Sequence, residues 1–413
     1  GRGESTDMAV APPEEAVAGR PAAAVRAQAA ERARIKLAWR QMPVLAGLRR
    51  RFRPEKPLRD VRIAAALHVS PESAHLLVAL KDAGAHVLLH PSNPRTVDAG
   101  AVAELERHRT IRVLDPSPGA DPDHLSAQLT DFRPQLLIDN STLLVACAER
   151  PESASELAGA TVHSRSGTQT VQALAAAGSP LTVPVLSLVD NPLKNSIETP
   201  MGTGQSTAAA VIGATGMQLS GKHVAIIGYG TAGRGIASYV SALRARVTVV
   251  DVSAVACLRA AAAGHGIDSL TNALSNADVV IVATGTHGVI GGHDLDLLRD
   301  GAVLGNIGHY ADAIDVPALT AAAKKVLPVS TGLDEYQLPD KSVYLLGGGV
   351  QFNHVCGGGN SSEMMDLSLS LHALCAVRLW ERRGSLPPGL SVAPEELTED
   401  VARAKLRTLG HVG

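Results

Sequence analysis

The sequence predicts an α/β protein built on two doubly wound, mainly parallel sheets. Apolar runs of strand length alternate with helical patterns through most of the chain, as in βαβ units. The 413 residues exceed the size at which one hydrophobic core stops growing, so two domains are expected. A polar, glycine-containing stretch over residues 191–204 separates two cycles of alternation, and we interpret it as a hinge.

The first domain is expected over residues 25–196. A helical pattern from Val25 to about Phe52 precedes the apolar run VRIAAALHV, which is typical of a buried parallel strand. The alternation continues as helix 72–83, strand AHVLLH, helix 97–107, strand QLLID, helix 142–148 and strand LTVPVLSLVD. Residues 1–24 mix Gly, Pro and charge without periodicity, so we expect a disordered N-terminal segment.

The second domain is expected over residues 197–357. Its strands are HVAIIG, RVTVVD, ADVVIVATG, AVLGNIG and KKVLPVS, each beside a helical pattern. A glycine-rich crossover after Tyr344 leads into one long helical pattern within residues 361–391. Periodicity alone does not fix where that helix packs; we interpret it as returning to the first domain. Residues 392–413 are expected to form a short C-terminal tail.

Composition favours a small-molecule partner in a reducing cytoplasm. The 38 Lys and Arg nearly balance the 40 Asp and Glu, so no global field favours nucleic acid or an anionic membrane. Aromatic residues are 2% of the chain, too few for a platform that stacks bases. No uninterrupted apolar run approaches the roughly 20 residues that span a bilayer. The four dispersed cysteines indicate neither a disulfide framework nor a metal site.

The turn GYGTAG, residues 228–233, follows a strand and opens a helix. Gly228 permits the tight turn, Gly230 lets the backbone approach a pyrophosphate, and Gly233 allows close helix packing. The next strand ends about 20 residues on at Asp251, where a carboxylate would bind ribose hydroxyls and repel a 2′-phosphate. A glycine turn can serve packing alone, but this combination predicts a Rossmann unit that binds NAD rather than NADP.

Further segments carry a family resemblance. GYGTAGRGIA, RVTVVD, VIVATGTHGVI and NIGHYADAIDV occur in the order and spacing found in the S-adenosylhomocysteine hydrolases. MPVLAGLRRRF, LHVSPES, GTGQST and MMDL resemble the short-tailed archaeal-type branch, so the likeness covers most of residues 38–408. It implies a substrate domain continued by the long helix, an NAD domain that closes over it, and a homodimer or homotetramer.

The resemblance also implies a reaction on an adenine nucleoside. Bound NAD oxidises the sugar 3′-hydroxyl to a ketone, which acidifies the C4′ proton. Loss of that proton allows the C5′ substituent to leave, after which water adds and the ketone is reduced again. This chemistry needs a base at the 3′-hydroxyl and an acid at the leaving group.

Four residues match family positions for these roles. Lys194 matches the lysine that assists 3′ deprotonation, and His68 the histidine assigned to acid/base work at C5′. His309 matches the histidine beside nicotinamide and sugar, and Glu72 the acid that reads the adenine amino group. Taken singly, Lys194 could be a solvated loop lysine, the histidines could be structural, and Glu72 could simply begin a helix.

The resemblance places other residues near the ligands. Those expected at the cofactor are Thr231, Ala232, Thr284, Gly285, Thr286, Ile307, Gly308, Asn353, Ser164, Arg165 and Ser166. Those expected at the substrate are Ser70, His163, Thr199 and Asn360, while Glu198 and Asn140 stand at catalytic positions.

Several of these positions depart from the family pattern. Asn140 replaces an aspartate, and residues 163–166, His-Ser-Arg-Ser, replace a glutamate followed by three threonines. Glu198-Thr199 replaces Asp-Asn, and Asn360 replaces the histidine of a GHPS turn. Asn140 cannot ionise, so it cannot sustain a neighbouring imidazolium. The sequence also stops at HVG, so we expect no counterpart of the Lys/Tyr-bearing C-terminal arm of the long-tailed members.

The changed residues are mainly substrate-recognising and the retained ones mainly redox. We therefore expect a diverged enzyme that eliminates water at C5′, a nucleoside dehydratase of the kind found in nucleoside-antibiotic biosynthesis. The alternative is a genuine adenosylhomocysteinase. A catalytically silent NAD-binding regulator would not need Lys194, His68 and His309 together, and a 2-hydroxy-acid dehydrogenase would lack the MPVL and LHVSPES segments.

Overall fold

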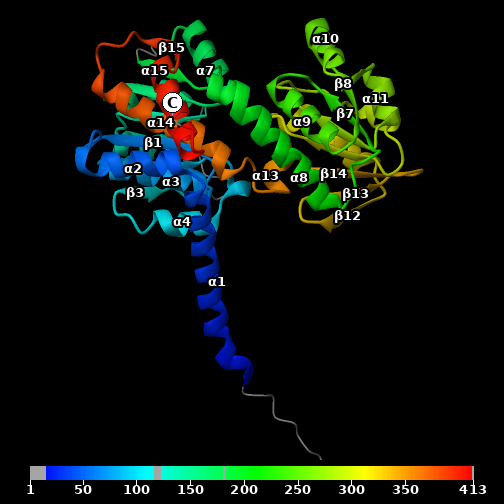
Figure 1. Ribbon diagram of the computed structural model, residues 1–413, viewed down its shortest axis with the longest axis horizontal. Coiled ribbons are helices and arrows are strands. Elements are labelled where there is room, and N and C mark those ends of the chain that lie inside the picture. Colours follow the sequence, from blue (N-terminus) through cyan, green and yellow to red (C-terminus); the bar gives the residue numbers. More distant parts are fainter. Residues whose placement is uncertain (1–14, 116–121, 141, 180–182, 412–413) are drawn as a thin grey trace, which may run out of the picture.

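The computed structural model describes residues 15–115, 122–140, 142–179 and 183–411, and it contains two sheets in separate halves of the molecule (Figure 1). The first sheet has the order β15-β6-β5-β4-β1-β2-β3, and the second β12-β13-β14-β11-β10-β7-β8-β9. The predicted α/β fold with two doubly wound sheets is confirmed.

All neighbouring strands of the first sheet are parallel. Alternate residues of β1 serve opposite faces, which explains its continuous apolar run: Ile63 packs with α2, α3 and α14, whereas Ala64 packs with α6 and α7. The strands are β1 (Arg62–Leu67), β2 (His86–Pro91), β3 (Ile111–Val113), β4 (Leu136–Asp139), β5 (Gly159–Val162), β6 (Pro184–Ser187) and β15 (Gly389–Val392).

The helices of this half cover both faces of the sheet. They are α1 (Glu15–Arg40), α2 (Pro43–Glu55), α3 (Pro71–Asp82), α4 (Ala99–Leu105), α5 (Pro122–Phe132), α6 (Thr142–Glu149), α7 (Arg165–Ala176), α14 (Ser362–Glu381) and α15 (Glu395–Thr408), with short turns η1 (Pro94–Thr96) and η2 (Pro151–Ala154). The long helix α14 packs on α2, α3 and β5, so it does return to the first half.

The second half contains the glycine turn. Its strands are β7 (His223–Ile227), β8 (Arg246–Val250), β9 (Gly266–Ile267), β10 (Val279–Val282), β11 (Val303–Asn306), β12 (Lys325–Ser330), β13 (Leu333–Gln337) and β14 (Ser342–Gln351). Its helices are α8 (Gly204–Thr215), α9 (Thr231–Ala242), α10 (Ala254–Ala262), α11 (Leu270–Asn276), α12 (Val316–Ala322) and α13 (Phe352–Val355), with η4 (Gly292–Leu297) and η5 (Ala311–Ala313).

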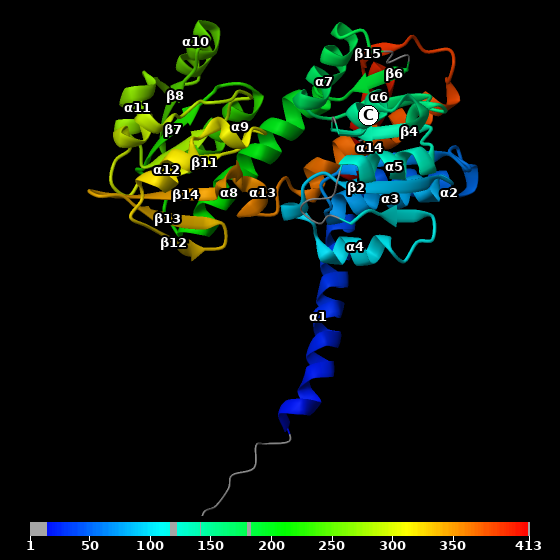
Figure 2. The same cartoon turned by 180° about the vertical axis from the view of Figure 1, so that it is seen from behind.

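The stretch interpreted as a hinge is helical. Leu193–Thr203 forms a π-helix, η3, that runs directly into α8 and passes between the two halves (Figures 1 and 2). It lies tightly against α9, because a Cβ on Gly235 would come within 2.1 Å of the Pro200 carbonyl oxygen. The segment that carries Lys194 and Glu198 is therefore fixed to α9, the helix that follows the glycine turn.

Three expectations need correction. Helix α1 begins at Glu15, so residues 15–24 are helical rather than disordered, and their alanines explain this because Ala has the highest helix propensity; residues 1–14 lie outside the described part. Residues 392–411 are not a separate tail, since β15 pairs with β6 and α15 buries Leu397 and Val401 in the first core. KKVLPVS forms β12, but it pairs antiparallel with β13 at the sheet edge.

Other strands escaped the sequence patterns. β3, β5 and β9 are only two to four residues long, too short to show a period. Within the described residues, no helix is both long and apolar enough to cross a membrane.

Candidate active site

Residues that follow strands of both sheets line one cavity of about 830 Å³. Ligands of doubly wound proteins bind outside the carboxyl ends of the strands, and this cavity has that position in both halves. His68 follows β1, Asn140 follows β4 and His163 follows β5, while Gly228, Asp251, Thr284 and Ile307 follow β7, β8, β10 and β11.

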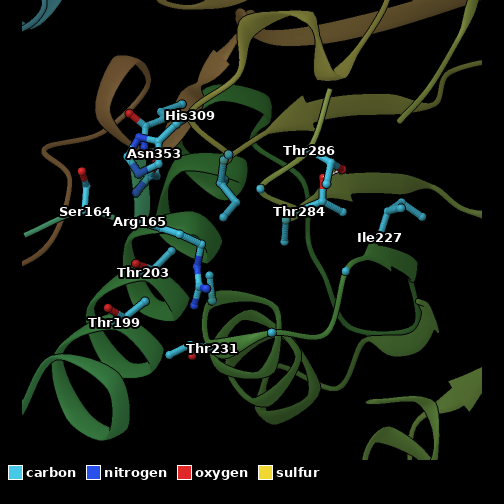
Figure 3. Close-up of a pocket in the computed structure, with 18 of the residues that line it drawn as sticks. Ser164, Arg165, Thr199, Thr203, Ile227, Thr231, Thr284, Thr286, His309 and Asn353 are labelled. Atoms are coloured by element: carbon cyan, nitrogen blue, oxygen red, sulfur yellow. Dashed lines mark hydrogen bonds between the residues drawn. The ribbon is translucent and has the colours of Figure 1, made fainter. Parts of the chain in front are cut away.

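Most of the predicted residues gather here (Figure 3). Those that line the cavity are His68, Asn140, His163, Ser164, Arg165, Lys194, Thr199, Gly228, Gly230, Thr231, Ala232, Asp251, Thr284, Gly285, Thr286, Ile307, Gly308, His309, Asn353 and Asn360. Five predicted residues are not part of the lining: Ser70, Glu72, Ser166, Glu198 and Gly233.

The glycine turn has the geometry that a dinucleotide requires. Gly228 has φ +100°, a conformation that favours glycine. A Cβ on Gly233 would lie 2.0 Å from the Gly228 carbonyl oxygen, so only glycine allows α9 to pack this closely. A Cβ on Gly230 would meet nothing within 4 Å, so open space lies beside the N-terminus of α9. A pyrophosphate fits that space.

Asp251 is held in place at the end of β8. Its carboxylate accepts hydrogen bonds from the backbone N–H groups of Tyr229, at 2.7 Å, and Ser253, at 2.8 Å. Val252 beside it is fully exposed and, with Leu270, lines the cavity. A carboxylate next to exposed apolar side chains is compatible with the adenosine half of NAD, so ribose binding by Asp251 stays a prediction.

Asn306 fixes the loop that carries His309. This fully buried amide donates to the carbonyl oxygens of Tyr310, at 2.9 Å, and Gly349, at 3.0 Å, and accepts from Gly308 N–H at 2.8 Å. His309 is therefore presented to the cavity by a rigid support. Asn306 belongs to the NIGHY motif but was not among the predicted site residues.

Lys194 and Glu198 form an ion pair on η3. Glu198 is completely buried, and its second oxygen accepts the backbone N–H of Ser368 at 3.2 Å. Lys194 lines the cavity, whereas Glu198 lies behind it. Glu198 thus orients the lysine instead of meeting a ligand itself, and the reading of Lys194 as a solvated loop residue is wrong.

Three of the cavity histidines are held neutral. Burial is the main cause that lowers the pKa of His68, His309 and His163, and for His163 the pKa falls well below its ordinary value. Lys194 lowers the pKa of His309 and His163 further. His68 Nδ1 lies 2.7 Å from the hydroxyl oxygen of Thr96, which leaves Nε2 available. A neutral imidazole with one fixed nitrogen can give or take a proton at the other.

Two of the changed positions hold unpaired polar atoms. Asn140 Oδ1 and His163 Nδ1 are buried and have no hydrogen-bond partner among the described residues. The His163 ring packs edge-on against His372, with centroids 5.2 Å apart. Buried polar groups without partners are rare in folded proteins, so these atoms point to a ligand.

Glu72 and Ser70 lie at the start of α3, behind the cavity wall. Ser70 caps the helix by accepting Ser73 N–H, and Glu72 accepts a hydrogen bond from the Ser362 hydroxyl at 2.6 Å. Their positions agree with a structural role, and adenine recognition by Glu72 stays a prediction.

Arg165 extends from the start of α7 toward Thr203 at the end of η3 and Thr231 at the start of α9 (Figure 3). Its guanidinium has no hydrogen bond or ion pair with a described residue. Because the N-terminus of α9 also carries partial positive charge, this arrangement favours an anion between them.

His354, on α13, is a cavity residue that the sequence patterns missed. Its ring stacks on that of His68 with centroids 5.2 Å apart and planes 5° from parallel. In the sequence, the only indication that His354 lies at the site is its position directly after the predicted Asn353. Asn195 and Thr203 were missed as well.

Comparison with known proteins identifies the family. A family model described as "S-adenosyl-L-homocysteine hydrolase, NAD binding domain" matches residues 200–359, and one described as "S-adenosyl-L-homocysteine hydrolase" matches residues 22–113. The chain is 37% identical over 386 residues to the adenosylhomocysteinase of Aeropyrum pernix, covering 92% of each protein. It is 34% identical over 386 residues to the enzyme of Nostoc sp., which covers 92% of this chain and 90% of the relative. It is 35% identical over 384 residues to the enzyme of Thermococcus kodakarensis, which covers 91% of this chain and 90% of the relative.

The chain belongs to the S-adenosyl-L-homocysteine hydrolase family. It is an NAD-dependent enzyme of that family, so the expected cofactor is confirmed. The relatives are named for hydrolysis, and they support that alternative better than the dehydration we expected from the changed residues.

Two of the motifs that carried the family resemblance meet in the structure. Asp366 of MMDL accepts the backbone N–H groups of Val44, at 3.0 Å, and Leu45, at 2.9 Å, in MPVL. This buried carboxylate caps α2 and so joins α2 to α14, the helix that returns from the second half.

Proposed function

We propose that this enzyme acts on an adenine nucleoside by oxidation at the sugar 3′-carbon, elimination at C5′ and final reduction. The observation that carries the proposal is the meeting of Lys194, His68 and His309 in one cavity with the glycine turn. NAD, when bound, accepts a hydride from the sugar and later returns it.

Lys194 is the proposed base at the 3′-hydroxyl. Its partner Glu198 is completely buried, so the amine is held in one orientation at the cavity wall. Positioned proton transfer of this kind contributes about 10²–10⁴-fold to a rate. His309 is proposed beside nicotinamide and sugar, on the loop that Asn306 fixes.

His68 is the proposed acid/base at C5′. Thr96 fixes its Nδ1, and burial keeps the ring neutral, so Nε2 can take a proton and give it to the leaving group. Ser70, Glu72, Thr199 and Asn360 are proposed to contribute to the adenine and sugar sites, and Asn140 and His163 to meet the C5′ side.

The cofactor is proposed to lie across both halves. The second half would bind its pyrophosphate at Gly230, Thr231 and Ala232 and its ribose at Asp251. Arg165 would add charge to the pyrophosphate from the first half. Thr284, Gly285, Thr286, Ile307, Gly308, Asn353, Ser164 and Ser166 are proposed around the remainder.

The names of the relatives favour hydrolysis of S-adenosylhomocysteine to adenosine and homocysteine as the net reaction. In that case water adds to the unsaturated ketone before the final reduction. This is the first candidate.

A second candidate, dehydration, rests on the unpaired atoms Asn140 Oδ1 and His163 Nδ1. Neutral donors and acceptors suit an uncharged hydroxyl better than a zwitterionic amino-acid tail, which requires complementary charge. The substrate would then carry a C5′-type hydroxyl leaving group, as in the psicofuranosyl adenine nucleoside angustmycin C, whose dehydration gives angustmycin A.

Incubation of the NAD-loaded enzyme with S-adenosylhomocysteine and, separately, with angustmycin C distinguishes the two. Mass spectrometry of the first reaction should show adenosine and homocysteine if the enzyme is a hydrolase. Loss of about 18 mass units from the second, with no net change in NAD, would establish dehydration. If the enzyme converts neither S-adenosylhomocysteine nor angustmycin C, the proposal is contradicted for both substrates.

Two further predictions of the sequence also remain proposals. We infer a homodimer or homotetramer, which light scattering would measure, and a cytoplasmic location, which fractionation of cells would test.

A further inference from the structure

His354 and His68 come from opposite halves of the molecule. His68 follows β1 in the first half, and His354 sits on α13, which follows β14 in the second. Their stacked rings, 5.2 Å apart at the centroids, therefore bridge the cavity between the halves. Any movement that opened the cavity would separate them.

The His354 ring is available to a ligand. Neither of its nitrogens has a hydrogen-bond partner among the residues that the structure describes. Gly359 closes one side, because a Cβ there would lie 2.5 Å from His354 Nδ1. Glycine at position 359 therefore leaves room for the His354 ring, which also borders His68 and the cavity.

The charged and titratable groups around the ring keep it neutral. Burial is the main cause that lowers the pKa of His354 to about 4, and His68, His309 and Lys194 lower it further. The carboxylate of Glu198, which pairs with Lys194, also accepts the backbone N–H of Ser368. Two stacked imidazoles with no free anion beside them can share one proton but cannot hold two.

A metal site is a poor explanation of the cluster. Within the described residues, no group of three or more His, Cys, Asp or Glu side chains is arranged to hold a metal ion.

We propose that His354 is a second acid/base residue, which works with His68 at C4′ and C5′ of the substrate. The inference rests on the proposed elimination but applies equally to hydrolysis and dehydration.

The proton balance of the step is closed. One neutral imidazole of the pair takes the C4′ proton, and the C–H electron pair forms the C4′–C5′ double bond as the bond from C5′ to the leaving group breaks. The resulting imidazolium, or its stacked partner after transfer of that proton, protonates the leaving group. The pair ends neutral, and no external acid is consumed.

The test uses the full-length, NAD-loaded enzyme and whichever of S-adenosylhomocysteine or angustmycin C the wild type turns over. Replacing His354 with Leu should lower product formation by about 10²-fold or more while 3′ oxidation continues. The absorbance of reduced nicotinamide should therefore rise toward one equivalent per site and persist. A loss of packing alone would not produce this accumulation.

His75→Leu is the matched control. His75 is also buried and stacked, on Trp39, but it lies outside the cavity lining, so this variant should keep both the product rate and the wild-type absorbance. A His68→Ala, His354→Leu double variant should be little worse than the more damaging single variant, because residues that act as a unit are not additive.

The possible outcomes separate the two proposals. A wild type that never reduces its NAD with either substrate would contradict the proposed function. A wild type that turns over, with a folded His354→Leu variant at normal rate, would overturn the role of His354 alone. If His354→Leu is misfolded by circular dichroism, His354→Gln, which keeps a polar planar group but no proton shuttle, must show the same accumulation or the inference is wrong.

Discussion

The two walls of the cavity differ in how completely their polar groups are satisfied. On the cofactor side, Asp251 accepts two backbone N–H groups, and Asn306 makes hydrogen bonds through both atoms of its amide. On the substrate side, Asn140 and His163 each bury an atom without a partner. Among the described cavity residues of the second half, only Asn353, on α13, has such an atom.

This difference separates the two sides of the site. The polar groups of the cofactor wall are held by the protein itself, whereas the unpaired atoms of the substrate wall lie at positions that depart from the family pattern. An unsatisfied buried polar group costs about 1–3 kcal/mol, so these atoms are retained at a cost that a bound ligand can offset. Among the described residues of the cofactor wall, only Asn353 calls for the same explanation. We therefore propose that the specificity of this enzyme resides in the substrate wall.

The largest expected effect is at Lys194. Lys194→Ala should lower turnover by about 10²–10⁴-fold, because the 3′-hydroxyl loses its base. Bound NAD should remain, since the cofactor wall is untouched. Stopped-flow absorbance at the reduced-nicotinamide band should show no rise on addition of substrate; reduction at the wild-type rate would exclude Lys194 as the base.

A second effect tests the cofactor wall through two glycines of one turn. Gly233→Ala places a methyl group 2.0 Å from the Gly228 oxygen and should cost about 1–3 kcal/mol of stability or more. Gly230→Ala meets no protein atom, so it should fold normally yet bind NAD more weakly. Thermal unfolding with and without NAD separates these results, and equal melting temperatures for the two apo variants would contradict the packing account.

The sequence predicts those parts of the site whose residues lie close together along the chain. The glycine turn and Asp251 are predictable because strand, turn and helix geometry requires glycines at fixed intervals. Lys194, His68 and His309 were found only through the family resemblance, as their positions follow different strands.

Other features depend on contacts between distant segments. The His68–His354 stack joins residues from opposite halves, and Asp366 caps a helix more than 300 residues away in sequence. The π-helix at 193–203 also gives no periodic signal, because Pro200 and Gly202, with Gly204 directly after the segment, resemble a loop in sequence. Such features require the packed structure.

The third prediction concerns acidification. Burial lowers the pKa of His75 and His372, both in the first half, to about 3. In the unfolded chain the histidine pKa values are near 6.5, so the unfolded chain binds protons that the folded chain excludes. The contribution of these two histidines to the free energy of unfolding is therefore fully present above pH ~6.5 and is lost as the pH falls toward 3. Urea unfolding should show a decrease of up to ~1.4 kcal/mol per pH unit for each such histidine.

The matched variant is His75→Leu, which should flatten that slope. An unchanged dependence between pH 7 and 5 would contradict the burial of His75 as a neutral ring.

The smallest expected effect is at Asp251. Asp251→Asn keeps an acceptor for Tyr229 or Ser253 but removes the charge that repels a 2′-phosphate. NAD affinity should fall about tenfold, roughly 1.4 kcal/mol, and preference over NADP should shrink. Calorimetric titration with both cofactors measures this, and an unchanged preference would disprove the assignment of Asp251.

Internal return of hydrogen at C3′ tests the central claim most directly. The enzyme with its own NAD is given the nucleoside that it turns over, carrying deuterium at C3′, in the presence of excess unlabelled NAD. Oxidation and reduction by one bound cofactor predict that the product keeps deuterium at C3′ and that free NAD stays unlabelled. Product that has lost the C3′ deuterium to the free cofactor, or product formed without any transient reduced nicotinamide, would contradict the account.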